Sequence, residues 1–239
     1  MQTYFWVCLI LFVAGVTHGM SGFGSVLLSI PLLAIFLDIK IVIPLANLAA
    51  VSMTVMVFIQ LRHQFDWKKI YALIAGAIPG IAAGVFFLKR LDRGVIHWIL
   101  GVILIGFSLY SLLLQPSGKK IRAGWAYPFG FLAGCLGGAF STSGPPVIVY
   151  TSLQAWSKDQ IKVTLQGFFF LSGLLIAVSH TLSGLVTFSV MRFYAAALPI
   201  LILGTYLGSR FYGFIREEDY RKIVLLLLAG LGGLMIYKA

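Results

Sequence analysis

The chain carries little charge, and its few charged residues are unevenly spread. Only 10% of its 239 residues are charged, with 7 Asp and Glu against 18 Lys and Arg. Five long stretches contain none of these four residue types: 1–37, 41–61, 70–88, 123–157 and 163–191. Each is long enough to cross a hydrocarbon core, which needs about 20 helical residues. With 60% hydrophobic residues and a mean hydropathy of +0.98, the composition excludes an ordinary soluble domain and predicts an all-α polytopic membrane protein.

Other absences exclude further classes of protein. The two cysteines, Cys8 and Cys135, lie far apart in apolar runs, which favours small core residues over a disulfide, metal or redox pair. The chain lacks the basic start of a signal peptide and the polar–apolar alternation of membrane strands. Its basic residues fall in short loops between apolar runs, where lipid headgroups explain them better than nucleic acid does. We expect no metal, no cofactor and no nucleic-acid partner.

The sequence is internally duplicated. Residues 14–24 (AGVTHGMSGFG) return as residues 133–143 (AGCLGGAFSTS), a shift of 119 positions that also matches Asn47 with Gln166. A shift of 120 matches Arg90 with Arg210. An ordered series of matches in an apolar, glycine-rich chain is typical of secondary transporters. We expect one transmembrane domain, 1–239, with repeat one at about 1–118 and repeat two at about 123–239.

Glycine and proline interrupt the start of each repeat. Because glycine weakens a helix and proline has no N–H to donate, each start should split into two half-length helices. Three ordinary spans follow each pair, giving about 8 to 10 helical segments. The interrupting residues are Gly19, Gly22 and Gly24 in repeat one, and Gly137, Gly138, Gly144, Pro145 and Pro146 in repeat two. The spans are expected at about 41–61, 69–89 and 94–115, and at about 163–181, 193–213 and 222–238.

The two halves of each start could form a broken helix that crosses once or a re-entrant hairpin. With hairpins, the 18 Lys and Arg residues divide 12 to 6 between the two sides of the membrane, whereas single crossings divide them 10 to 8. The positive-inside rule therefore favours hairpins, with both termini outside the cytoplasm. Three crossings per repeat would also make the repeats inverted, the arrangement used in alternating access.

A deep binding site in such a protein must be built from neutral donors, because every Asp, Glu, Lys and Arg lies in a loop or near a span end. Half-helix N-termini near Gly24 and Gly144 offer free N–H groups and a partial positive charge. Inverted repeats would bring these breaks together around one small oxyanion. Packing of small residues between helices is the alternative role. The candidate binding residues are Ser21, Gly22, Phe23, Gly24, Ser25, Asn47, Ser141, Thr142, Ser143, Gly144, Pro145 and Gln166.

Amide and imidazole side chains inside the apolar runs are further candidates. Asn47 and Gln166 either line the cavity or hold the unwound loops in place, since an amide in hydrocarbon needs a partner. His18, at the first break, is the candidate for a coupling proton, or else a hydrogen-bonded helix-end histidine. A weak-acid substrate could instead carry the proton, or the membrane potential could drive export. His97 and His180 are expected at the membrane interface.

Three motifs resemble the TauE/SafE family of membrane anion exporters. They are residues 19–33 (GMSGFGSVLLSIPLL), residues 130–150 (GFLAGCLGGAFSTSGPPVIVY), followed by 159–171 with Gln166, and residues 197–210 (ALPILILGTYLGSR). The likeness covers nearly the whole chain. It implies a non-enzymatic exporter of sulfite, thiosulfate or an organosulfonate in the bacterial inner membrane, with the anion and the lipid bilayer as its partners. Phe23 and Ser25 stand where many members carry a longer glycine run, so the substrate need not be sulfite.

Other functions share some of these features. A passive anion channel or an importer would have the same sequence pattern. Ser141–Gly144 resembles the nucleophile turn of an intramembrane hydrolase with His180 as a distant base, but the opening glycine is missing and repeat one would have no reason to copy the turn. Lipid-facing helices could also form a homodimer. The favoured interpretation is alternating access, with the anion held by two half-helix N-termini.

Overall fold

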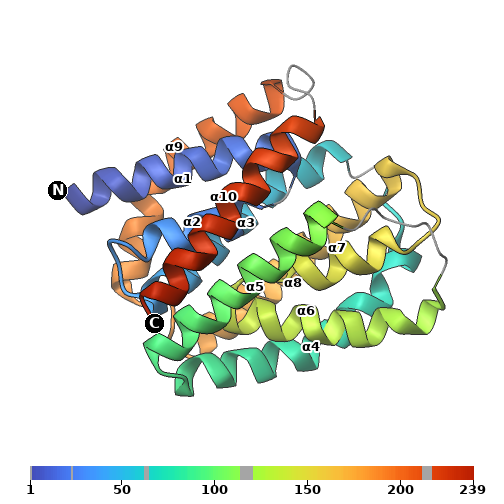
Figure 1. Ribbon diagram of the computed structural model, residues 1–239, viewed down its shortest axis with the longest axis horizontal. Helices are drawn as coiled ribbons and strands as arrows, with labels where there is room; N and C mark the ends of the chain where they lie inside the picture. The colour runs from blue at the N-terminus through green and yellow to red at the C-terminus, as the bar shows by residue number, and fades with distance from the viewer. Residues whose placement is uncertain (1, 23, 62–64, 114–120, 212–216) are drawn as a thin grey trace.

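The computed structural model is an all-helical bundle, described for residues 2–22, 24–61, 65–113, 121–211 and 217–239 (Figure 1). Ten α-helices and a short 3₁₀ turn at Ala123–Trp125 account for nearly all of these residues, and no strand occurs among them. The helices of the first half are α1 (Gln2–Ser21), α2 (Ser25–Leu33), α3 (Ile39–Leu61), α4 (Trp67–Arg90) and α5 (Arg93–Leu113). Those of the second half are α6 (Ala126–Phe140), α7 (Gly144–Ser152), α8 (Lys158–Leu182), α9 (Phe188–Phe211) and α10 (Glu217–Tyr237).

Six of these helices are long and apolar enough to cross a membrane: α1 and α3 to α5 in the first half, α8 and α9 in the second. In α10, residues 222–237 form a shorter apolar helix. The prediction of a polytopic all-α membrane protein is therefore confirmed. The predicted splits are also present, although the two parts are unequal: α1 has 20 residues and α6 has 15, whereas α2 and α7 have 9 each.

The same backbone turn ends the first helix of each pair. The N–H of Gly22 donates to the carbonyl of His18 (2.6 Å), and the N–H of Ser141 donates to that of Gly137 (2.7 Å). Gly22 and Ser141 lie 119 positions apart, and both have left-handed backbones, with φ of 75° and 55°. Such a C-terminal residue satisfies helix carbonyls and stops the helix. The same type of helix break therefore occurs at Gly22 in the first half and at Ser141 in the second.

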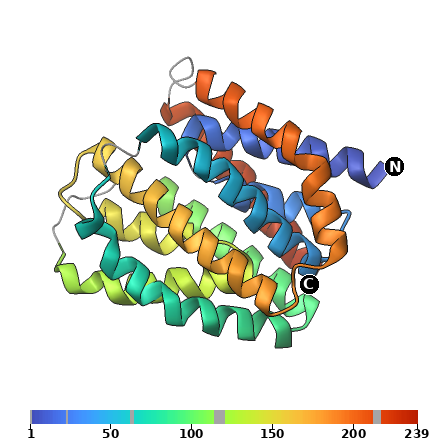
Figure 2. The same ribbon diagram turned by 180° about the vertical axis from the view of Figure 1, so that it is seen from behind.

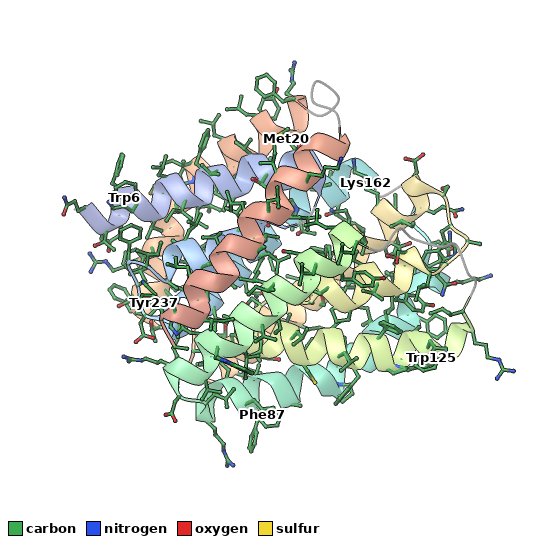
Figure 3. All side chains as sticks on the ribbon, viewed as in Figure 1. Trp6, Met20, Phe87, Trp125, Lys162 and Tyr237 are labelled. Carbon is green, nitrogen blue, oxygen red and sulfur yellow. The ribbon has the colours of Figure 1, made fainter. Side chains whose placement is uncertain are left out.

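Both pairs of helices fold back on themselves. α2 packs on α1 and α7 packs on α6. In Figure 1 the chain returns after α2 to the end of the bundle where α1 began, and both termini lie at that end. Trp6, early in α1, and Trp125, just before α6, lie at opposite ends (Figure 3). The hairpins therefore enter the bundle from opposite ends. Their relation to the two sides of a membrane, and with it the inverted-repeat arrangement, stays a prediction.

Glycine allows two helix pairs to pack backbone against backbone. On α4, Gly76, Gly80 and Gly84 face carbonyl oxygens of α6, and a Cβ at any of them would overlap its carbonyl. In return, Gly130, Gly134 and Gly138 of α6 face carbonyls of α4. α1 and α9 meet in the same way through Gly15, Gly19, Gly204 and Gly208. Small residues at every fourth position are a common means of close packing between membrane helices.

Each half of the chain makes its main helix contacts with the other half. The first helix of each half packs on the fourth helix of the other: α1 on α9 and α6 on α4 (Figures 1 and 2). The third helices, α3 and α8, contact each other, as do the fifth, α5 and α10. These contacts bring the two helix breaks together beside α3 and α8.

Candidate functional site

A cavity of about 60 Å³ lies between the two helix breaks. A single water needs roughly 10–15 Å³, so the cavity has room for a solute of a few heavy atoms. Both breaks line it, together with parts of the helices α1, α2, α3, α7 and α8. The lining residues are His18, Gly24, Ser25, Val26, Leu27, Asn47, Ala50, Val51, Thr54, Ser141, Thr142, Ser143, Gly144, Ile148, Phe169, Gly173 and Ile176. All are uncharged, with His18 the one titratable side chain among them.

Equivalent positions of the two halves meet in this cavity. Gly24 with Ser143, and Ser25 with Gly144, are pairs 119 positions apart in which both members line it. The same holds for Ala50 with Phe169 and for Thr54 with Gly173. The cavity therefore lies where the two halves face each other, but each pair supplies two different side chains. The resulting site is asymmetric in its chemistry.

The first break contributes mainly backbone donors. Leu28 makes the first i→i−4 bond of α2, its N–H donating to the carbonyl of Gly24 (3.1 Å). The N–H groups of Ser25, Val26 and Leu27 precede that bond and have no acceptor within their own helix. All three residues line the cavity. Three N–H groups at a helix N-terminus form a suitable site for an anion.

His18 and Ser25 join the two helices of this break. The hydroxyl of Ser25 lies 3.0 Å from Nδ1 of His18, and both side chains are buried. Nε2 of His18 has no hydrogen-bond partner among the described residues. The contact between Nδ1 and the hydroxyl orients the ring, which leaves the second nitrogen available for a proton or a ligand.

The second break contributes fewer N–H groups than expected. Pro145 and Pro146 stand in the first turn of α7 and have no N–H, so Gly144 supplies the first backbone donor there. Hydroxyl groups are more numerous at this break. That of Ser141 donates to the carbonyl of Ile43 on α3 (2.9 Å), and that of Thr142 to the carbonyl of Phe140 (3.0 Å).

The two matched amides have different roles in the structure. Nδ2 of Asn47 donates to the carbonyl of Gly173 on α8 (3.2 Å), and Asn47 lines the cavity. Nε2 of Gln166 donates to the carbonyl of Gly22 within the first break, and Gln166 does not line the cavity. One amide thus joins α3 to α8, while the other fixes the unwound turn of the opposite half. Both are below 4% exposed, as an amide with a buried partner should be.

The structure brings most of the predicted site residues together. Seven of the twelve line the cavity: Gly24, Ser25, Asn47, Ser141, Thr142, Ser143 and Gly144. Gly22, Pro145 and Gln166 adjoin it without lining it. Phe23 and the side chain of Ser21 lie outside the described residues. The sequence interpretation missed Thr54 and the apolar wall formed by Ile148, Phe169 and Ile176.

His180 lies in the last turn of α8, and its expected place at the membrane interface stays a prediction. Its side chain is fully buried, and Nε2 lies 2.8 Å from the carbonyl of Gly138 on α6. His97, by contrast, is only partly buried near the start of α5, with Nδ1 2.7 Å from the carbonyl of Arg93. Since the His180 ring pairs with a backbone carbonyl and the Ser141 hydroxyl with Ile43, the described contacts contain no pairing of these two residues as base and nucleophile.

A multi-pass helical bundle that encloses a small neutral cavity between two helix breaks belongs to the class of membrane transport proteins. The family model described as sulfite exporter TauE/SafE matches residues 7–235, almost the entire chain. The chain therefore belongs to the TauE/SafE sulfite exporter family.

Two curated proteins are similar to this chain. It is 27% identical over 184 residues to the probable sulfite/organosulfonate exporter TauE of Cupriavidus necator, a match that covers 75% of this chain and 72% of that protein. It is 25% identical over 172 residues to the probable inner membrane transporter protein TsaS of Comamonas testosteroni, covering 71% and 72%. No solved structure gives a significant match. The chain is a membrane anion transporter of the bacterial inner membrane, and both relatives carry names of transporters rather than enzymes.

Proposed function

We propose that this protein exports a small sulfur-containing oxyanion (sulfite, thiosulfate or an organosulfonate) across the inner membrane by alternating access. The anion is held between the N-termini of α2 and α7. One observation carries the proposal: the two breaks, far apart in sequence, line a single cavity. The family and the names of the two relatives support the substrate class.

The chemistry of the cavity suits an anion that must be released again. Three N–H groups of α2, the N–H of Gly144 and the nearby hydroxyls can donate to the oxygens of a tetrahedral or pyramidal anion. Hydrogen bonds to a charged group contribute roughly 1.5–3 kcal/mol each. The lining has no Lys or Arg, so no full countercharge holds the anion in place. Such a site binds an anion and still lets it leave.

A proton-coupling role for His18 is part of the proposal. The ring lines the cavity and has a free Nε2, so a proton taken up there would lie beside the bound anion. A charge inside a membrane is costly, and a proton that partly neutralises the anion reduces this cost. Proton and anion would then cross together.

The first test is binding to purified protein in detergent. Thermal shifts are measured with sulfite, thiosulfate, taurine and sulfoacetate, and with sulfate and phosphate for comparison. Stabilisation by a sulfur anion, reduced in Ser143→Ala, is the expected result. If none of these anions stabilises the wild-type protein, the proposed substrate class is wrong.

A second test distinguishes a transporter from a passive channel and establishes the direction in which the anion moves. Proteoliposomes loaded with the binding anion are diluted into labelled anion outside. A transporter gives saturable counterflow, which a channel does not. The rates in vesicles of known orientation distinguish export from import.

A further inference from the structure

The hydroxyl groups around the cavity differ in whether they already have a partner. Ser25 pairs with His18, Ser141 donates to Ile43, and Thr142 donates to Phe140. The hydroxyls of Ser143 and Thr54 have no hydrogen-bond partner within the described part of the chain, although Ser143 is only 8% exposed and Thr54 only 2%. These two groups come from opposite halves of the protein.

Thr54 departs from the usual behaviour of threonine in a buried helix. Such a hydroxyl normally donates to the carbonyl three or four residues earlier, which satisfies it without any ligand. Thr164 donates in this way to Gln160 (2.7 Å), and Thr205 to Leu201 (2.9 Å). Thr17 and Thr151 do the same. Thr54 makes no such bond, and its side chain lines the cavity. The Thr54 hydroxyl is therefore available to a ligand in the cavity.

The location of Thr54 assigns it to one wall of the site. It lies seven residues after Asn47, two turns along α3, so both project from the same helix face. The Asn47 amide nitrogen already donates to Gly173. Gly173 is the residue equivalent to Thr54 in the second half, and Phe169 lies one turn before it on α8. Thr54 therefore supplies a hydroxyl from α3, whereas the equivalent position on α8 supplies none and adjoins an apolar side chain.

We propose that Thr54 is a substrate-binding residue that donates a hydrogen bond to the anion from α3, in addition to the contacts made by the helix breaks. Ser143 donates from the second break, so the anion is held by one free hydroxyl from each half. Because the equivalent of Thr54 is a glycine next to Phe169 in the lining, an organosulfonate binds in one preferred orientation, its sulfonate oxygens toward the breaks and Thr54 and its organic part toward Phe169. This inference rests on the proposed function and adds to it the residue that orients the substrate.

The test compares three variants with the wild type. Thr54→Val removes the hydroxyl at nearly constant shape, and Thr54→Ser keeps the hydroxyl. Thr164→Val is the matched control, because it removes a hydroxyl from a buried helical threonine that donates to its own helix. The affinity for sulfite and for thiosulfate is measured with purified protein, together with the melting temperature without ligand.

We expect Thr54→Val to weaken anion binding about tenfold or more, as for a lost hydrogen bond to a charged group, with little change in the ligand-free melting temperature. Thr54→Ser should remain within about threefold of the wild type, and Thr164→Val should bind normally. Normal binding by Thr54→Val, or a loss in Thr54→Ser equal to that in Thr54→Val, overturns the inference alone. Failure of the wild type to bind any of the anions overturns the proposed function as well.

Discussion

At the scale of residues, the polar side chains in and around the cavity fall into those that hold the structure and those that remain available to bind an anion. Ser141, Asn47 and Gln166 each donate to a backbone carbonyl of the opposite half, which fixes the breaks relative to α3 and α8. Ser143 and Thr54 have no such partner among the described residues. Substitutions should therefore separate stability from binding, even between serines two positions apart.

The two serines of the second break give a direct comparison. Ser143→Ala should weaken anion binding severalfold and leave the melting temperature nearly unchanged. Ser141→Ala should lower stability by about 1–3 kcal/mol, because the buried carbonyl of Ile43 loses its donor. Both effects can be measured by thermal unfolding with and without the anion. The reverse result, a destabilised Ser143→Ala with normal affinity, would contradict this division.

Substitutions of His18 and His97 give a second comparison, which concerns the pH dependence of transport. If His18 carries the coupling proton, anion flux in the wild type should depend on pH, and His18→Gln should lose most of that dependence. His97→Gln, at a partly buried position that does not line the cavity, should keep the dependence of the wild type. Flux is measured in proteoliposomes at several pH values. A His18→Gln protein with an unchanged pH profile would mean that the proton travels by another route.

At the scale of elements, glycine has two separate tasks. In the breaks, Gly22 and Gly24 permit left-handed backbone, and a side chain at Gly24 would meet no atom within 4 Å. In α4 and α6, glycine permits contact between backbones, and any side chain would overlap a carbonyl. The first task concerns the site and the second concerns the fold.

Substitution in the breaks should affect transport more than folding. At Gly144 a Cβ would meet only ordinary contacts, the nearest at 3.7 Å, so Gly144→Leu should fill part of the cavity and abolish transport while the protein still inserts. Gly24→Leu should do the same with an added cost of about 1–2 kcal/mol for the left-handed backbone. Expression, gel filtration and flux distinguish these effects. Normal flux in Gly144→Leu would argue against binding at the breaks.

Substitution of the glycines at the α4–α6 contact should instead affect folding more than transport. Gly80→Leu or Gly134→Leu forces the two backbones apart and should prevent recovery of folded, monodisperse protein. Gly106→Leu and Gly230→Leu are matched controls on α5 and α10, because a Cβ at either position meets nothing within 4 Å. Gel filtration after detergent extraction provides the measurement. Equal yields from both groups would show that close contact of α4 with α6 is dispensable.

At the scale of the whole molecule, the hairpins give a topology that labelling can test. In a background with Cys8 and Cys135 replaced by alanine, cysteines introduced at Gln2 and Ala239 should react with an impermeant reagent added outside the cytoplasm. A cysteine at Arg122 should react only after the cytoplasmic face is exposed, because Trp125 lies at the opposite end of the bundle from Trp6. Labelling of residues 2 and 122 from the same side would contradict the hairpin topology.

The sequence was most informative where local chemistry decides the structure. The starts of α2 and α7 follow from Gly24 and from Gly144 with its two prolines, and both were predicted at the correct residues. Sequence reasoning could not assign partners that come from distant helices. Gln166 bonds a carbonyl 144 positions away, and His180 one 42 positions away, so their roles depended on how the helices assemble. Thr54 escaped notice because a lone threonine in an apolar helix usually satisfies itself.

The glycine contacts between helices determine which parts of the protein can move separately. α4 with α6, and α1 with α9, touch along their backbones, so we expect each pair to move as one rigid body. Each rigid body combines one helix from the first half of the chain with one from the second. A conformational change that opens the cavity should therefore cost the least free energy when each pair tilts as a unit relative to α3 and α8. The units expected to move together are thus composites of both halves of the chain, whereas the sequence matches follow chain order.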